Sequence, residues 1–113
     1  MKKIGGAGNE DYQTIEVTNF DGAIFNIELF FRFATNYWYL TVTTADFSVR
    51  NMKVVMSPNL LRQYSAYFNF GIACIVDDGV DPRFIDDFQV ERASLYLLDA
   101  DDVAAYEESL SNG

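Results

Sequence analysis

Residues 24–40 read IFNIELFFRFATNYWYL and hold seven aromatic side chains in seventeen positions. Apolar and polar residues alternate in this segment on both sides of Ala34–Asn36, and asparagine tolerates the backbone of a tight turn. This pattern predicts a β-hairpin whose turn falls near Ala34–Asn36. We expect one face of the hairpin to point into the core, carrying Phe25, Ile27, Leu29, Phe31, Phe33, Trp38, Leu40 and Val42.

The opposite face of this hairpin is unusually aromatic. Polar residues such as Asn26, Glu28 and Thr41 lie there, but so do bulky apolar ones. Because a solvated face rarely carries this much aromatic surface, we expect it to be covered by another subunit. The predicted partner interface consists of Phe30, Tyr37 and Tyr39, joined by Tyr106 and Leu110 of a C-terminal helix.

The remaining segments predict further strands and two helices. The expected strands are 13–20, 52–56 after a bulge at Arg50–Asn51, 71–76 and 93–98, with a tight turn at Asp21–Gly22. One short helix should begin at Ser57–Pro58 and end near residue 67, a helical turn is possible after Pro82, and Asp99–Asp102 should cap a terminal helix. Short connections favour an antiparallel sheet.

The fold class predicted is therefore mainly β: a small antiparallel β-barrel or sandwich with one short internal helix and a C-terminal helix. At 113 residues the chain has room for one core. We expect a flexible N-terminal arm over residues 1–12, which are polar and glycine-rich, and a single β-rich domain over residues 13–113 that ends in an acidic helix.

The residue types present argue against several classes of chemistry. The chain has no histidine and one cysteine, Cys74, which lies in the apolar run GIACIV and should be a buried thiol. No Ser–His or Cys–His pair and no zinc site of the usual kind can form. No secretory signal and no apolar run of membrane-spanning length is present. We therefore expect no catalytic residues, no cofactor, no metal and no membrane anchor.

The negative charge is concentrated in the last third of the chain. The net charge is −9, and residues 77–113 hold eleven acidic and two basic residues, whereas residues 1–76 hold six of each. Binding to a nucleic acid backbone needs a basic surface, so no nucleic acid partner is expected. The acidic third is compatible with a solvated face, with docking on a basic partner, or with mimicry of DNA.

Two acidic clusters have weaker functional interpretations. Asp77, Asp78 and Asp81 surround Gly79 like part of a calcium loop, but their spacing differs from that of an EF-hand. The neighbouring pair Asp86–Asp87 could serve a glycosidase or a carbohydrate-binding module, although adjacent carboxylates seldom converge on one substrate atom.

The order of several short motifs resembles the baseplate plug-like proteins of contractile-tailed bacteriophages. These motifs cover about residues 14–102 and are Phe25–Phe33, Trp38-Tyr39-Leu40, Met52-Lys53-Val54-Val55, Leu60-Leu61-Arg62-Gln63-Tyr64, Gly71–Val76, Asp81-Pro82 with Asp87-Phe88, and Leu95-Tyr96-Leu97-Leu98-Asp99. The hairpin turn is shorter than the usual pattern, without its glycine- or arginine-containing tip, and the acidic tail is longer.

The resemblance implies a structural component of the phage tail baseplate, without enzymatic activity. Such a protein would be a plug or ring subunit at the junction of the tail tube and the central hub and spike, assembled in the host cytoplasm and carried in the virion. Its partners would be other tail and baseplate proteins and further copies of itself, as a trimer or hexamer. The alternative is an acidic DNA-mimic inhibitor of a host nuclease or DNA-binding protein.

Overall fold

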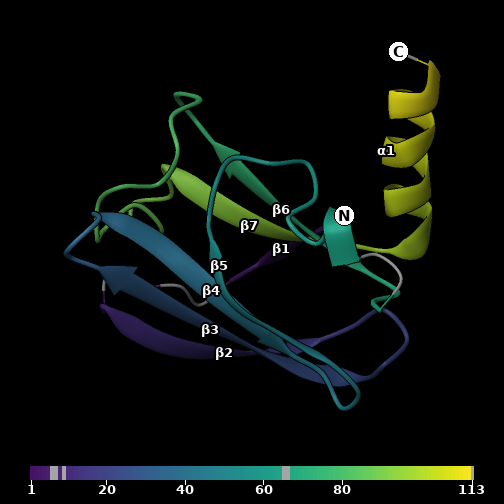
Figure 1. Ribbon diagram of the computed structural model, residues 1–113, viewed down its shortest axis with the longest axis horizontal. Coiled ribbons are helices and arrows are strands. Elements are labelled where there is room, and N and C mark those ends of the chain that lie inside the picture. Colours follow the sequence, from purple (N-terminus) through teal and green to yellow (C-terminus); the bar gives the residue numbers. More distant parts are fainter. Residues whose placement is uncertain (6–7, 9, 65–66, 113) are drawn as a thin grey trace.

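Two antiparallel β-sheets face each other in the computed structural model, and a single α-helix follows them (Figure 1). The structure describes residues 1–5, 8, 10–64 and 67–112, the last three of these by their backbone only. One sheet has the strand order β1-β7-β6 and the other β2-β3-β4-β5. The elements are β1 (Lys2–Ile4), β2 (Tyr12–Thr18), β3 (Ile24–Arg32), β4 (Tyr37–Thr43), β5 (Ser48–Lys53), the 3₁₀-helix η1 (Arg62–Tyr64), β6 (Gly71–Val76), β7 (Ala93–Leu98) and α1 (Ala100–Asn112).

The mainly β prediction is confirmed, and of its two forms the structure adopts the sandwich rather than a closed barrel. The chain crosses between the sheets through residues 54–60. The Val54 N–H donates to the Trp38 carbonyl, Ser57 and Cys74 exchange two backbone hydrogen bonds, and the Leu60 N–H donates to the Ile72 carbonyl. These bonds tie the β5 edge of one sheet to the β6 edge of the other.

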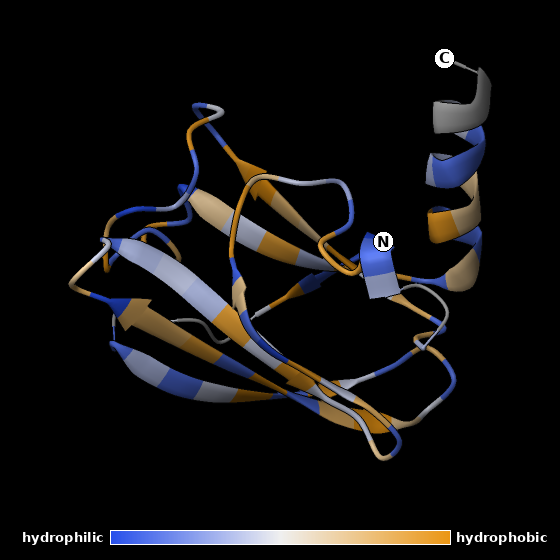
Figure 2. Cartoon of the chain, in the orientation of Figure 1, coloured by the Kyte–Doolittle hydropathy of each residue, from blue (hydrophilic) through white to orange (hydrophobic). Residues whose placement is uncertain are grey.

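The aromatic hairpin forms as predicted and contributes seven buried side chains to the core: Phe25, Ile27, Leu29, Phe31, Trp38, Leu40 and Val42. β3 pairs with β4 in the register Phe31 opposite Trp38 and Leu29 opposite Leu40. Asn36 closes the turn with a φ of 59°, in the left-handed region. Buried and exposed residues alternate along β3, and the corresponding bands of apolar and polar colour are visible along the strands in Figure 2. Period-two patterning therefore determined which face is buried.

Trp38 lies at the centre of the packed layer and is fully buried. Its ring makes edge-on contacts with Phe31 and Phe88, with ring centres 5.4 and 5.3 Å away, and its indole N–H donates to the Phe84 carbonyl at 2.9 Å. At the other end of the core, Phe25 stacks on Phe70 at 4.4 Å. The hydrogen bond from Trp38 fixes the loop between β6 and β7 onto the four-stranded sheet.

One core prediction is wrong: Phe33 is 62 % exposed. The alternation would place it beside Phe31, and their rings do meet at 5.1 Å. However, β3 ends at Arg32 and the chain turns there, since the N–H groups of Thr35 and Asn36 donate to the Arg32 carbonyl. Phe33 therefore extends beyond the end of the opposing sheet, where no second layer covers it.

The internal helix is much shorter than predicted. Of the described residues between Ser57 and Tyr67, only η1 is helical. Asn59 accounts for the difference, because its buried side-chain oxygen accepts hydrogen bonds from the N–H groups of Leu61 and Ile72. Together with the bridge from Ser57 to Cys74, this contact commits the segment to the sheet. Residues 65–66, where the predicted helix would end, lie outside the described residues.

Three further boundaries differ in detail. β2 ends at Thr18, so a five-residue loop, 19–23, replaces the predicted two-residue turn, with Gly22 at a φ of 89°. The predicted bulge at Arg50–Asn51 is confirmed by the shifted β4–β5 register and by Asn51 at a φ of 59°, but β5 lies on both sides of it. After Pro82 the described backbone forms successive turns without a helix.

The first strand and the terminal helix both adjoin β7. Lys2–Ile4 belong to the segment expected to be a flexible arm, and they form β1, paired with β7. At the other end, Asp99 caps α1: its carboxylate accepts the Asp102 N–H at 2.7 Å, and Asp102 accepts the Asp99 N–H at 3.2 Å. From this cap α1 projects beside one end of the sandwich (Figure 1).

Candidate assembly surface

The outer face of the four-stranded sheet brings three of the predicted interface residues together. The strand register places Phe30 opposite Tyr39, and Arg32 opposite Tyr37 in the next outer row. The Phe30 and Tyr39 rings stack with their centres 5.8 Å apart. Tyr39 of β4 is also paired with Lys53 of β5, so the Lys53 side chain lies on the same outer face as these rings. Phe30, Tyr37 and Tyr39 are each half-buried.

Two cations cover these rings. The Arg32 guanidinium lies 5.3 Å from the Phe30 ring centre and 5.0 Å from that of Tyr39. The Lys53 ammonium lies 3.6 Å from the Tyr37 ring centre. We call these five residues (Phe30, Arg32, Tyr37, Tyr39 and Lys53) the cation–aromatic cluster. Cation–π contacts at exposed sites contribute about 0.5–1 kcal/mol each, which favours this arrangement of cations over the rings.

The charges of this cluster are not neutralised by carboxylates. Within the described part of the chain, no acidic side chain lies within salt-bridge distance of Arg32 or Lys53. On the same face, Glu28 accepts a hydrogen bond of 2.6 Å from the Tyr12 hydroxyl. The cluster thus offers flat apolar rings together with cationic groups, a combination that suits a partner with apolar and acidic side chains.

The predicted C-terminal contact residues lie elsewhere. Tyr106 is half-buried on α1, at the opposite end of the molecule from the β3–β4 turn (Figure 1). The Leu110 side chain lies outside the described residues. Sequence spacing placed both on one helix, but it contained no signal for the separation of that helix from the hairpin turn.

Sequence reasoning missed an exposed apolar pair next to the hairpin turn. Phe33 is 62 % exposed and Phe84, in the β6–β7 loop, is 58 % exposed. Together with Tyr37 and Arg83 they line a groove of about 530 Å³. We call Phe33, Tyr37, Arg83 and Phe84 the tip surface. The sequence alternation continues through Phe33 and contains no signal that β3 ends at Arg32.

The acidic β6–β7 loop is organised around a buried ion pair. Asp87 is almost fully buried and accepts the N–H groups of Arg83 and Phe84 at 2.7 and 2.8 Å. Its two carboxylate oxygens also accept Nε and Nη2 of Arg92, each at 2.8 Å. Burial alone would raise the pKa of Asp87, but these hydrogen bonds outweigh it, and the pKa lies below its ordinary value.

Arg92 joins the rest of this loop to Asp87. Its Nη1 donates to the Asp78 carboxylate at 2.6 Å and to the Val80 carbonyl at 3.1 Å, and Nη2 donates to the Asp81 carbonyl. The hydrogen bond with Asp87 raises the pKa of Arg92. One carboxylate of each predicted acidic cluster, Asp78 and Asp87, is therefore held by Arg92, while the Asp81 carboxylate accepts the Met56 N–H and Asp86 is exposed.

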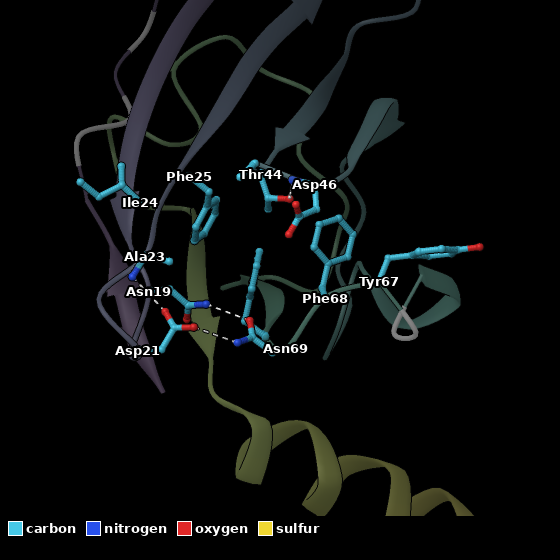
Figure 3. Close-up of a pocket in the computed structure, with 12 residues that line it drawn as sticks. Asn19, Asp21, Ala23, Ile24, Phe25, Thr44, Asp46, Tyr67, Phe68 and Asn69 are labelled. Atoms are coloured by element: carbon cyan, nitrogen blue, oxygen red, sulfur yellow. Dashed lines mark hydrogen bonds between the residues drawn. The ribbon is translucent and has the colours of Figure 1, made fainter.

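A second cleft opens at the other end of the sandwich, between the β2–β3 and β4–β5 loops (Figure 3). It encloses about 450 Å³. Asn69 links two residues of its rim, donating to the Asp21 carboxylate and accepting from the Asn19 amide, both at 3.0 Å. A backbone hydrogen bond from Ala23 and the contact with Asn69 lower the pKa of Asp21. We call Asp21, Ile24, Asp46, Tyr67 and Phe68 the end cleft.

The described residues contain no cluster of three or more histidine, cysteine, aspartate or glutamate side chains arranged to hold a metal ion. Among them, no helix combines the length and apolar character needed to cross a membrane. Cys74 is buried as predicted, and burial raises the pKa of its thiol to about 12. This thiol is therefore protonated and unreactive at neutral pH.

Comparison with known proteins gives one family. A family model described as the cyanophage baseplate Pam3 plug gp18 matches residues 1–101. The matched region contains all seven strands and the start of α1. A comparison with curated proteins gave no match.

Proposed function

The chain belongs to the cyanophage baseplate plug family, a family of structural proteins of the phage baseplate, and we propose that it is a plug or ring subunit where the tail tube meets the central hub and spike. Its role there is assembly rather than catalysis. The tube, hub and spike proteins of a contractile tail are its partners, further copies of the chain complete a trimer or hexamer, and the whole assembles in the host cytoplasm.

The observation that carries this proposal is the cation–aromatic cluster. Three rings lie on the outer face of a sheet whose inner face is already buried, and the two cations above them have no carboxylate partner among the described residues. Covering apolar surface contributes about 25 cal/mol per Å², and unpaired cations favour an acidic partner. Phe30, Tyr37 and Tyr39 are therefore the proposed contact residues of this face.

The contribution of Tyr106 and Leu110 to the interface remains part of the same proposal. Tyr106 lies on α1, which projects beside the sandwich, so it is reached by a neighbour other than the one that covers the sheet (Figure 1). The family match ends at residue 101 and leaves most of α1 outside. We therefore propose that α1 contacts a neighbouring protein through residues that lie outside the region matched by the family.

The alternative functions receive less support. A DNA mimic needs its carboxylates displayed on the surface, whereas Asp87 is buried and both Asp87 and Asp78 are already paired with Arg92. A sugar-cleaving pair needs Asp87 free to face a substrate, whereas its oxygens accept four hydrogen bonds from Arg83, Phe84 and Arg92.

The test is incorporation into virions. We expect mass spectrometry of purified phage to detect the chain, and a tagged copy to co-purify with tube and hub proteins. The double variant Phe30→Ser plus Tyr39→Ser should fold but incorporate at least tenfold less. Ile75→Ser, on the exposed face of the other sheet, is the matched control and should incorporate normally. Absence of the chain from virions would refute the proposal.

A further inference from the structure

The antiparallel topology separates two unlike surfaces. β3 runs from Ile24 to Arg32, nine residues, which span about 26 Å at the rise of a strand. The β2–β3 and β4–β5 loops therefore lie at one end of the sandwich and the β3–β4 turn lies at the other, with α1 at the end opposite this turn (Figure 1).

The tip surface combines exposed rings with cations. Phe33 and Phe84 are more than half exposed and flank a groove that also contacts Arg83. Lys53 adds its ammonium group above Tyr37. Of the described acidic side chains, none forms a salt bridge with Arg83 or Lys53. Exposed phenylalanines beside unpaired cations are the features of a docking surface rather than of a solvated loop.

The end cleft carries carboxylates opposite in charge to the cations of the tip surface, together with apolar side chains. Figure 3 shows the Asp46 carboxylate facing the cleft beside Phe68, with Asp21 across from it. Ile24 and Tyr67, 59 % and 61 % exposed, form apolar walls. The Asp46 carboxylate makes no hydrogen bond or ion pair within the described part of the chain. The same end carries the acidic helix α1.

We propose that the tip surface of one copy docks in the end cleft of a second copy, a contact that rests on the self-assembly part of the proposed function. Phe33 enters between the apolar walls, and the cations of the tip face Asp46 and Asp21. Because the two surfaces differ and lie at opposite ends, the contact is heterologous. Successive copies therefore follow one another head to tail, and a ring forms where the rotation between copies closes.

A second copy is favoured over another baseplate protein by charge. The end cleft and α1 together present Asp21, Asp46, Asp101 and Glu108, while two cations near α1 are already paired, Arg62 with Glu107 and the Met1 amino group with Asp102. An anionic end of this kind needs a cationic partner surface, and the tip surface with Lys53 provides one on the same chain. Docking by a basic segment of a different protein is the competing outcome.

Complementation between two defective variants tests this contact. Phe33→Asp removes the ring from the tip, and Asp46→Lys reverses the charge of the cleft. Light scattering of the purified full-length chain should give an oligomer for the wild type, a monomer for each variant, and a 1:1 heterodimer when the two variants are mixed. The Phe33→Asp variant keeps an intact end cleft and the Asp46→Lys variant keeps an intact tip surface. One contact can therefore form between them, and no third copy can be added. Ile75→Asp, exposed on β6, is the control and should keep the wild-type mass.

Several results would overturn the contact: a monomeric wild type, a variant that keeps the wild-type mass, or a mixture that stays monomeric. Heterodimer formation also shows that both variants are folded. The outcome is independent of virion incorporation. A chain found in virions but monomeric when purified would overturn this contact alone, whereas a heterodimer from a chain absent from virions would overturn the baseplate proposal alone.

Discussion

The β6–β7 loop and helix α1 are both acidic, but they use their charge in opposite ways. In the loop, Asp87 is buried and Arg92 binds it through two hydrogen bonds. On α1, Asp101 and Glu108 are exposed, and the helix carries no basic residue in its last turn. Asp87 therefore determines the local structure of the loop, whereas Asp101 and Glu108 of the helix leave negative charge at the surface for a partner. Net charge alone does not distinguish the two uses.

The largest effect should come from breaking the loop pair. Asp87→Asn leaves the Arg92 guanidinium, which is 19 % exposed, without its buried counter-charge. Removing one partner of a buried ion pair costs about 3–5 kcal/mol, and we expect the lower end because Asp78 still accepts from Arg92. Urea unfolding followed by tryptophan fluorescence measures the loss, since Trp38 contacts this loop through Phe84.

The neighbouring carboxylate provides the matched control. Asp86→Asn changes an exposed side chain one position away and should alter the free energy of unfolding by less than about 0.5 kcal/mol. Equal effects of the two variants on the free energy of unfolding would contradict the structural role of Asp87. The Asp86–Asp87 pair would then again be a candidate for a carbohydrate site.

The same pair predicts a pH dependence. The pKa of Asp87 is lower in the folded chain than in the unfolded chain, so its contribution to stability is complete at neutral pH and is lost as the pH falls through the folded value. Wild-type stability should therefore begin to decline below about pH 5, as the pH approaches the unfolded pKa of about 3.9, and should continue to decline below that value. Asp87→Asn should show a shallower decline in urea titrations between pH 7 and pH 3, and parallel curves would exclude Asp87 as the cause.

How far the sequence predicts this structure depends on the range of the interactions involved. Period-two patterning located the aromatic hairpin, and the core position of Trp38 follows from it, because strand alternation is local. The helix after Ser57–Pro58 and the burial of Phe33 were misjudged because both depend on distant partners. The helix is displaced by the hydrogen bond from the Ile72 N–H to Asn59, and the burial of Phe33 depends on the extent of the opposing sheet. No local pattern contains that information.

The candidate surfaces show the same limit. The hairpin pattern placed Phe30, Tyr37 and Tyr39 on one face, which the register bears out, although their role as an interface stays a prediction. It did not indicate that Arg32 and Lys53 would cover these rings, because Lys53 arrives from another strand across a bulge. Nor did it indicate that Phe84 and Phe33 would line one groove, since that placement depends on the Trp38 hydrogen bond to the loop.

Removing the N-terminal cap of α1 should have a moderate effect on the stability of the helix. Asp99→Ala removes the acceptor of the Asp102 N–H and a negative charge near the helix N-terminus. Loss of such a cap costs about 1 kcal/mol. We expect this loss of helix stability to appear as a weaker circular dichroism signal at 222 nm, while the near-ultraviolet signal of Trp38 in the core is preserved. Asp99→Asn, which retains a capping oxygen, should restore most of the signal.

The smallest effect should come from the ion pair that ties α1 to η1. Arg62 Nε and Glu107 lie 2.9 Å apart, but their side chains are 55 % and 39 % exposed. Water and salt screen such a pair, so Glu107→Gln should cost no more than about 1 kcal/mol. A double-mutant cycle with Arg62→Gln, measured by urea unfolding at low and high salt, isolates the pair, and its coupling should shrink as salt rises. A coupling as large and as insensitive to salt as that expected for Asp87 and Arg92 would erase the contrast between loop and helix, because α1 would then be fixed to the body by its charges rather than left to present them.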